Sequence, residues 1–248
     1  MQLSSEFTFY IFTFQATFDT IIFSFRKLCC LESPVPSQVI CAKTLDNPRR
    51  LSSVVSKIAL QIQCKLGGEL WGCQTPNAGL MVIGIDVFHD ASRLQGSVAA
   101  ICASTNASFS LWHSQSLSPQ ERGQELIDTL KVAFIESLRA YRASNNVWPR
   151  SVLVFRDGIG NAQINASAQL EISSLKSALQ AILEPDETEP KYAFVVVQKR
   201  INTRFLTISP TGVVSNPKPG TVVDSVVKRR GHKEFFLVSQ NVRQGKMF

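Results

Sequence analysis

Four short runs of apolar, mostly β-branched residues constrain the fold of this 248-residue chain more than any other feature. They occupy residues 80–87, 98–103, 152–155 and 194–197. Each run has the length of a buried strand. Amphipathic patterns predict helices at about 51–63, 118–141 and 166–183, and a further strand is expected at 108–113. This alternation predicts an α/β fold, but several α/β folds share the same order of elements.

The predicted helix at 118–141 has both a start signal and an apolar stripe. Ser118, Pro119 and Glu121 form an N-cap, a first-turn proline and a capping box. The stripe consists of Ile127, Leu130, Phe134, Leu138 and Tyr141. The spacing of these residues predicts that one face of the helix packs against the sheet.

The charge of the chain favours polyanionic partners. Lysine and arginine number 26 against 19 acidic residues, which gives a formal charge of +7. From residue 191 onward there are eleven basic residues and two acidic ones, Asp224 and Glu234. Such a distribution is typical of a phosphate-binding surface, although a solvated charged face would look the same.

Two further features bound the class of protein. The six cysteines lie in the first half with no metal-binding spacing, which predicts a reduced intracellular protein. The phenylalanine-rich segment 1–25 lacks a basic leader and is interrupted by Glu6, Gln15 and Asp19. We therefore interpret it as a domain broken at its start, not as a signal peptide or a membrane span.

Two aspartates stand at the ends of predicted core strands. Asp86 closes the run 80–87, and Asp157 follows the run 152–155. A carboxylate there is costly unless it meets a cation or hydrogen bonds. Magnesium prefers such oxygen ligands, and two ions about 4 Å apart can activate a water and stabilise the leaving oxygen of a phosphodiester. Either aspartate alone could simply cap a turn, but the pair on successive strands favours a metal site.

Six blocks of sequence, in their order and spacing, resemble the Piwi clade of Argonaute proteins. They begin at Lys65, Val82, Phe155, Val197, Pro219 and Phe236 and read KLGGELW, VIGIDVFHD, FRDGIG, VQKRINTRF, PGTVVD and FLVSQ. The resemblance covers about residues 27–246. It implies an RNase H-like Piwi domain at 67–248, with a mixed central sheet flanked by helices and a truncated C-terminal end. A partial Mid domain at 26–66 and a non-matching segment at 1–25 would precede it.

The resemblance also implies a chemistry. The family cuts target RNA opposite a bound guide with two aspartates, a mobile glutamate and a histidine or aspartate around two metal ions. The matching residues are Asp86, Asp157 and, in Gly123-Gln-Glu-Leu-Ile, Glu125. The neighbouring acids Glu121 and Asp128 match less well. The implied cofactor is Mg²⁺, with Mn²⁺ as the alternative.

This sequence departs from the family pattern in two places. The fourth catalytic residue would lie beyond the segment that begins at Ser239, and none of His89, His113 and His232 matches it. Asn161-Ala162 stands where the family has an acid and a glycine. Two functions therefore remain open: an RNA-guided endonuclease, or an inactive RNA-binding module or truncated gene product that keeps the fold.

The resemblance further implies two RNA contacts. The family holds the 5′ phosphate of its guide in the Mid domain, and the matching residues are Lys27, Gln38, Gln61 and Lys65, with Arg26 as a substitute for Lys27. Gln61 and Lys65 are four residues apart and share one helix face. The basic run Lys199, Arg200 and Arg204 is expected to contact the RNA backbone, although an exposed loop would also carry it.

The expected partners are a small guide RNA of the piRNA type, a complementary target RNA and proteins of Piwi complexes, with no membrane contact. The expected location is cytoplasmic ribonucleoprotein granules, with the nucleus as the alternative.

Overall fold

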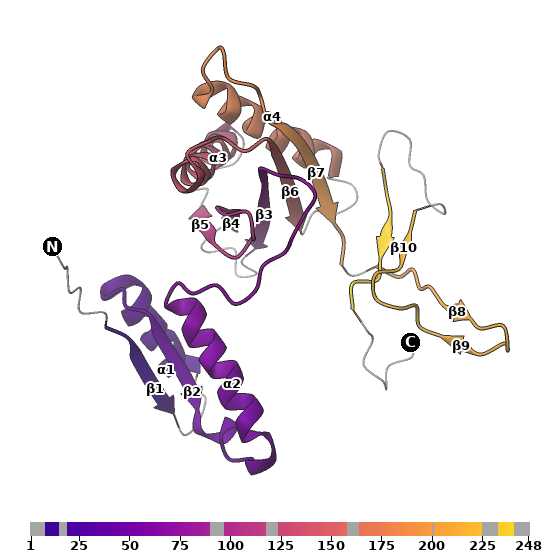
Figure 1. Cartoon of the computed structure of the whole chain (residues 1–248). Coiled ribbons are helices and arrows are strands. Elements are labelled where there is room, and N and C mark those ends of the chain that lie inside the picture. Colours follow the sequence, from indigo (N-terminus) through magenta and orange to yellow (C-terminus); the bar gives the residue numbers. More distant parts are fainter. Residues whose placement is uncertain are drawn as a thin grey trace. The chain divides into compact units, whose positions relative to one another are not determined.

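A computed structural model describes residues 8–14, 19–89, 97–117, 124–157, 164–199, 201–224 and 233–240. The chain divides into two compact units, Met1–Val197 and Gln198–Phe248. Figure 1 shows the elements of both units along the chain.

The first unit opens with a small parallel pair of strands, β1 (Tyr10–Phe14) and β2 (Ser37–Cys41), in which Tyr10 lies opposite Ser37. The connection between them contains α1 (Asp19–Lys27) and the π-helical turn η1 (Leu28–Glu32). The ring of Phe12 packs edge-on against that of Phe25, with 4.2 Å between centroids. These aromatic side chains are thus part of a small packed layer.

Helix α2 (Pro48–Lys65) follows the short turn η2 (Ala42–Thr44). It begins three residues before the predicted start at residue 51, because Asn47 caps it. The Asn47 side chain accepts a hydrogen bond from the backbone N–H of Arg49, and Pro48 occupies the first helical position.

The centre of the first unit is a five-stranded mixed sheet with the strand order β5-β4-β3-β6-β7. Its strands are β3 (Leu80–His89), β4 (Ser97–Ser104), β5 (Trp112–Leu117), β6 (Ser151–Asp157) and β7 (Lys191–Val197). Strands β3, β4 and β5 pair antiparallel, while β6 runs parallel to both β3 and β7. The predicted α/β fold with a mixed central sheet is confirmed.

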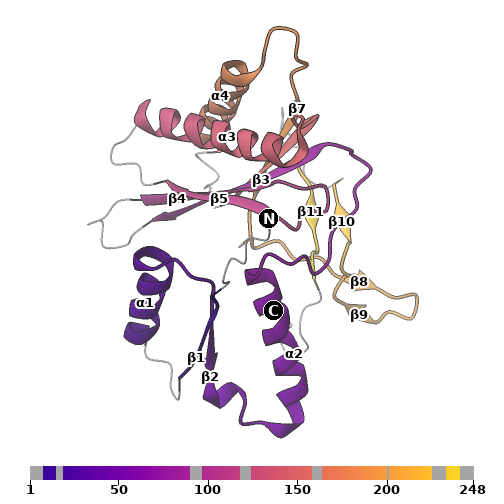
Figure 2. The same cartoon turned by 60° about the vertical axis from the view of Figure 1, so that its left-hand side comes forward.

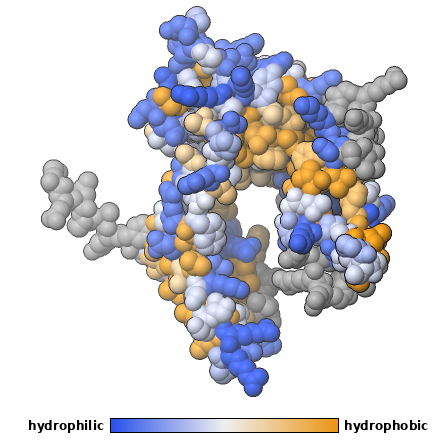
Figure 3. All heavy atoms as spheres, turned by 45° about the vertical axis from the view of Figure 1, so that its right-hand side comes forward, coloured by the Kyte–Doolittle hydropathy of each residue, from blue (hydrophilic) through white to orange (hydrophobic). Residues whose placement is uncertain are grey.

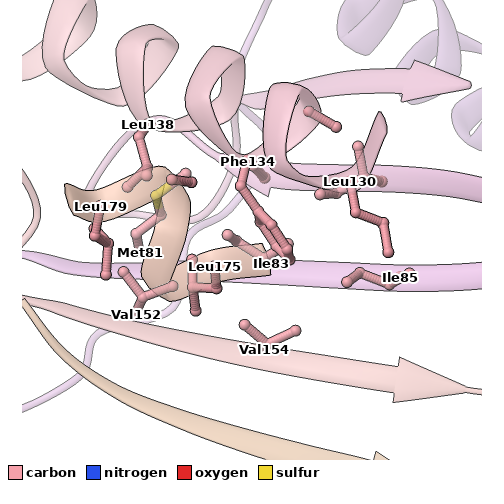
Figure 4. Packing of buried hydrophobic residues seen from close by; sticks show 14 of the residues in the cluster. Met81, Ile83, Ile85, Leu130, Phe134, Leu138, Val152, Val154, Leu175 and Leu179 are labelled. Carbon is pink, nitrogen blue, oxygen red and sulfur yellow. The ribbon is translucent and has the colours of Figure 1, made fainter. Parts of the chain in front are cut away.

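Helices α3 (Gln124–Asn145) and α4 (Ile164–Ile182) pack against each other over one face of this sheet (Figure 2). Alternate residues of β3 and β6 point into the helices, and the apolar stripe of α3 fills the space between (Figure 4). The fully buried side chains include Met81, Ile83, Val154, Phe134 and Leu138. Each large apolar side chain buried in this way contributes roughly 1.5–3 kcal/mol relative to exposure.

The strand predicted at 108–113 is wrong in its position, because strand β5 begins at Trp112. The residues before it form a turn organised by Asn106, whose side-chain oxygen accepts hydrogen bonds from the backbone N–H groups of Ser110 and Leu111 at 3.0 and 3.1 Å. Such side-chain bonds offer the backbone an alternative to a ladder. The predicted cap of α3, Ser118 to Glu121, lies outside the described residues.

The second unit contains two short hairpins. Strand β8 (Thr207–Ile208) pairs with β9 (Val214–Ser215), and β10 (Val222–Val223) pairs with β11 (Phe236–Leu237). The first hairpin turns at Gly212, whose φ is 81°. Phe205 and Phe236 pack edge-on at 5.0 Å.

The described surface keeps many large apolar side chains exposed, and apolar patches are visible in Figure 3. On the sheet face opposite α3 and α4, Phe88 is 69% exposed and Phe155 39%. Within the described residues, no helix combines the length and the apolar character that crossing a bilayer requires.

Candidate metal site and guide-end pocket

The register of the central sheet places Asp86 level with Asp157. Strands β3 and β6 run parallel, and Ile85 is the partner of Arg156. The next position on each strand is an aspartate, and neighbouring strands lie about 4.8 Å apart. The sheet therefore brings together the two predicted carboxylate-bearing residues from positions more than seventy apart in the sequence.

Both aspartates project from the sheet face opposite the helices. Side chains alternate along a strand, and the preceding residues, Ile85 and Arg156, are buried on the helix side. Asp86 is exposed and Asp157 is half-buried. On either side of the pair stand the small or apolar residues Ala100 and Val197, so the neighbouring strands add no charge at this level.

The donor atoms of this pair fit a hard divalent cation, which prefers carboxylate oxygens and retains several waters. Asp86 also has the local bond that a simple cap would make, because its Oδ1 accepts the N–H of Val87 at 2.8 Å. A bond to one oxygen is compatible with metal binding by the other. Among the described residues, no group of three or more histidine, cysteine or acidic side chains is arranged around a common point.

The third predicted residue, Glu125, is the second residue of α3. Its side chain lies outside the described residues, as do the side chains of Asp128 and His89 and the whole of Glu121, Arg200, His232 and Asn161-Ala162. His113 is in β5, two strands away from β3, and its Nε2 is 2.8 Å from the Gln115 amide nitrogen. It does not take part in the aspartate pair.

A buried ion pair lies directly behind Asp157, and the sequence reasoning missed it. Arg156 Nε donates to Glu171 Oε1 of α4 at 2.7 Å, and Arg156 Nη1 donates to the backbone carbonyl of Asp157. Burial raises the pKa of Glu171, while the hydrogen bond and charge of Arg156 oppose that rise. The alternation of β6 could have placed Arg156 on the buried face, but nothing in the sequence indicates its partner.

Three of the four predicted guide-end residues meet at the end of α2. Gln38 is buried, and its Nε2 donates to Gln61 Oε1 at 3.1 Å. Lys65 Nζ donates to Gln38 Oε1 at 2.9 Å and to the carbonyl of Ser37 at 2.6 Å. Lys27 is on the surface instead, where its Nζ lies 3.3 Å from Glu32.

The helix end explains why Lys65 sits at this point. The left-handed conformation of Gly67, with φ of 83°, ends α2 directly after Lys65. At Gly68 an added Cβ would meet only the exposed, flexible side chain of Gln63, which can move aside, so the constraint on the turn comes from Gly67. Gly67 of the KLGG block thus fixes the end of α2 beside Lys65.

The basic run lies in the second unit as far as the structure describes it. Lys199 and Arg204 are exposed. Arg204 Nη1 donates to the carbonyls of Ile201 and Thr203, at 2.6 and 3.0 Å. These bonds hold the loop after β7 in shape.

Comparison with known proteins decides the family. A family model described as the Piwi domain matches residues 11–247. The chain belongs to the Piwi family of Argonaute proteins. The resemblance expected from the six sequence blocks is confirmed.

Relatives in this family include Piwi-like protein Ago3 of Bombyx mori, 44% identical over 220 residues, and Protein argonaute-3 of Drosophila melanogaster, 43% identical over 221 residues. Each alignment covers 89% of this chain but only 23% and 24% of the respective relative. The chain thus spans about a quarter of the length of these Piwi proteins.

Solved structures of the family share the fold. Drosophila Piwi superposes with a TM-score of 0.78 at 26% identity, over 95% of this chain and 31% of that one. Kluyveromyces polysporus Argonaute with a guide RNA gives 0.77 at 20% identity, over 93% and 30%. The second likeness supports the Piwi fold alone.

Proposed function

We propose that this chain is the part of a Piwi protein that holds the 5′ end of a small guide RNA and supplies two carboxylates for cleavage of a target RNA. The observation that carries the proposal is the level placement of Asp86 and Asp157 on adjacent parallel strands. The piRNA class of guide is the choice that fits a Piwi relative of the Ago3 type.

The guide-end pocket is suited to a phosphate because its polar groups already converge. Lys65 supplies a full positive charge, and Gln38 and Gln61 supply amides that are linked to it in one hydrogen-bonded chain. Charge-assisted bonds of this kind are stronger than neutral ones. Because they contact phosphate and not base edges, the pocket would accept a guide of any sequence.

Asp86 and Asp157 would hold Mg²⁺, with Mn²⁺ as a substitute, and Glu125 would complete the site. When bound, a pair of divalent ions supplies Lewis-acid activation of water and neutralises charge that develops on the scissile phosphate. The two aspartates would orient the ions from a rigid sheet, while Glu125 at the start of α3 would gate the site. Lys199, Arg200 and Arg204 would contact the RNA backbone.

A specific observation also favours a second candidate, an RNA-binding module that does not cleave. Among the histidines whose side chains the structure describes, His113 is held in β5, two strands away from the β3 strand that carries Asp86, and does not approach the aspartates. Such a module would bind guide and target and act by silencing without cutting. Such a module would bind the guide through the same residues, and its binding of guide and target would not depend on Mg²⁺.

Cleavage of a labelled target tests both candidates. The chain is incubated with Mg²⁺, a 5′-phosphorylated guide and a matched target, beside the variants Asp157→Ala and Lys65→Ala. The endonuclease predicts guide-dependent cleavage that Asp157→Ala abolishes. The binding module predicts guide retention without cleavage, and guide binding that is unaffected by Lys65→Ala would contradict the proposed pocket. Fractionation of cells would test the proposed location in cytoplasmic granules or the nucleus.

A further inference from the structure

The Arg156–Glu171 pair occupies an unusual place for buried charge. Both side chains are more than nine-tenths buried, at 8% and 9% exposure. They join the C-terminal end of strand β6 to helix α4. The same guanidinium also donates to the backbone carbonyl of Asp157. Glu171 Oε2 is buried and has no hydrogen-bond partner among the described residues.

Stability alone is a weak reason for such a pair. Desolvation of two charges offsets most of their attraction, and well-packed apolar residues are often as stabilising. A bidentate guanidinium, in contrast, fixes the geometry of two acceptors at once. Here the two acceptors are the Glu171 carboxylate of α4 and the backbone carbonyl of Asp157 itself.

That second contact acts at the end of β6, where pairing with β3 has ended and pairing with β7 continues to Val197. Asp157 is the last residue of β6, and the register with β3 ends one residue earlier, at Arg156. The direction of a side chain at a strand end follows the orientation of its own peptide planes. Fixing this carbonyl therefore restricts the positions that the Asp157 carboxylate can take relative to Asp86.

We propose that Arg156 and Glu171 are positioning residues, which act through Asp157 to set the spacing of the two carboxylates that bind metal. This inference rests on the proposed metal site. Neither residue would contact the metal, since both lie on the helix side of the sheet. Outer groups that orient metal ligands in this way typically change affinity by about 10- to 100-fold when altered.

Mn²⁺ binding to the purified full chain tests the inference without relying on cleavage. Titrations followed by electron paramagnetic resonance compare the unmodified chain with Arg156→Lys, which keeps the charge but loses the fork, and with Glu171→Gln. Each variant is titrated well below its own Tm. We expect Mn²⁺ to bind about tenfold more weakly to both variants.

The control is a second ion pair far from the aspartates, Arg142–Glu187, whose charged atoms are 3.8 Å apart. Arg142→Lys should bind Mn²⁺ as the unmodified chain does. Unchanged Mn²⁺ affinity in Arg156→Lys and Glu171→Gln, with a lower Tm, would overturn the positioning role and leave a structural one. If Arg156→Lys fails to fold, Glu171→Gln decides alone. The proposed metal site itself predicts that Asp157→Asn loses Mn²⁺ binding. Unchanged Mn²⁺ binding in Asp157→Asn would overturn the site and not only the positioning role.

Discussion

Glu171 brings a carboxylate into the interior between β6 and α4, where water cannot solvate it. Burial raises its pKa, and the hydrogen bond and charge of Arg156 only partly oppose this. The folded chain therefore takes up a proton on Glu171 at a higher pH than the unfolded chain does. By linkage, the contribution of Glu171 to the free energy of unfolding is greatest below the ordinary carboxyl pKa and falls as pH rises through the raised value.

This sign gives a prediction for Glu171→Gln, whose amide cannot ionise. The free energy of unfolding of the unmodified chain, minus that of the variant, should decrease as pH rises from the ordinary carboxyl range towards neutrality. Urea denaturation at a series of pH values measures it. A difference that grows with pH would show that Arg156 dominates and lowers the pKa.

At Gly67 the backbone, not a side chain, sets the constraint. Its φ of 83° is a conformation that residues with a Cβ adopt at a cost, although no heavy atom lies within 4 Å of an added Cβ. Gly67→Ala should therefore lower the free energy of unfolding by about 1 kcal/mol, measured by urea denaturation. Gly84→Ala is the matched control, because its site is equally open and its φ is not positive. Equal losses in both variants would contradict a conformational cause.

At the scale of elements, the segment after α2 is tied to the turn between β4 and β5. Glu69 accepts hydrogen bonds from Asn106 Nδ2 at 3.2 Å and Ser108 Oγ at 3.0 Å, and Cys73 N–H donates to the Ser108 carbonyl at 2.9 Å. Hydrogen bonds from Ser110, Ser108 and Asn106 hold the pKa of Glu69 below its ordinary value. This attachment is therefore complete above the ordinary carboxyl pKa and is lost as pH falls through the lowered one.

Removal of the Asn106 side chain should release this attachment. The backbone N–H groups of Ser110 and Leu111 donate to the Asn106 side chain. Asn106→Ala is therefore expected to speed hydrogen exchange at these two amides and across residues 69–73. Asn77→Ala serves as the control, because the described hydrogen bonds of Asn77 are made by its backbone. Unchanged exchange at Ser110 in Asn106→Ala would rule out the organising role of this side chain.

These elements also show what a sequence can predict. Strands β3 and β6 were predicted because their runs are apolar on both faces, and the α3 stripe from Leu130 to Tyr141 is buried as expected. Strand β5 was misplaced because the bonds of Asn106 override the strand propensity of Phe109. The strand β1 was not predicted, since its phenylalanines lack a clear period. The partner of Arg156 lies fifteen residues away on a helix and depends on packing that no local pattern encodes.

At the scale of the whole molecule, the chain has the Piwi fold, with the aspartate pair on its sheet and a polar cluster at the end of α2, and it spans about a quarter of the length of its curated relatives. The sheet face that bears Asp86 and Asp157 also exposes Phe88 and Phe155. The second unit carries Lys199 and Arg204 on its surface. The predicted catalytic, guide-end and backbone roles of these residues stay predictions, as do the domain boundaries at residues 26 and 67.

The central claim is that Asp86 and Asp157 form one metal site, and a double-mutant cycle of Mn²⁺ affinity tests it most directly. Titrations compare the unmodified chain with Asp86→Asn, Asp157→Asn and the double variant. Asp186→Asn, a substitution of an exposed aspartate, is the control. If the two carboxylates share a site, each single change should remove most of the binding, and the double change should add little. Two independent, additive losses, or affinities equal to that of Asp186→Asn, would contradict the claim.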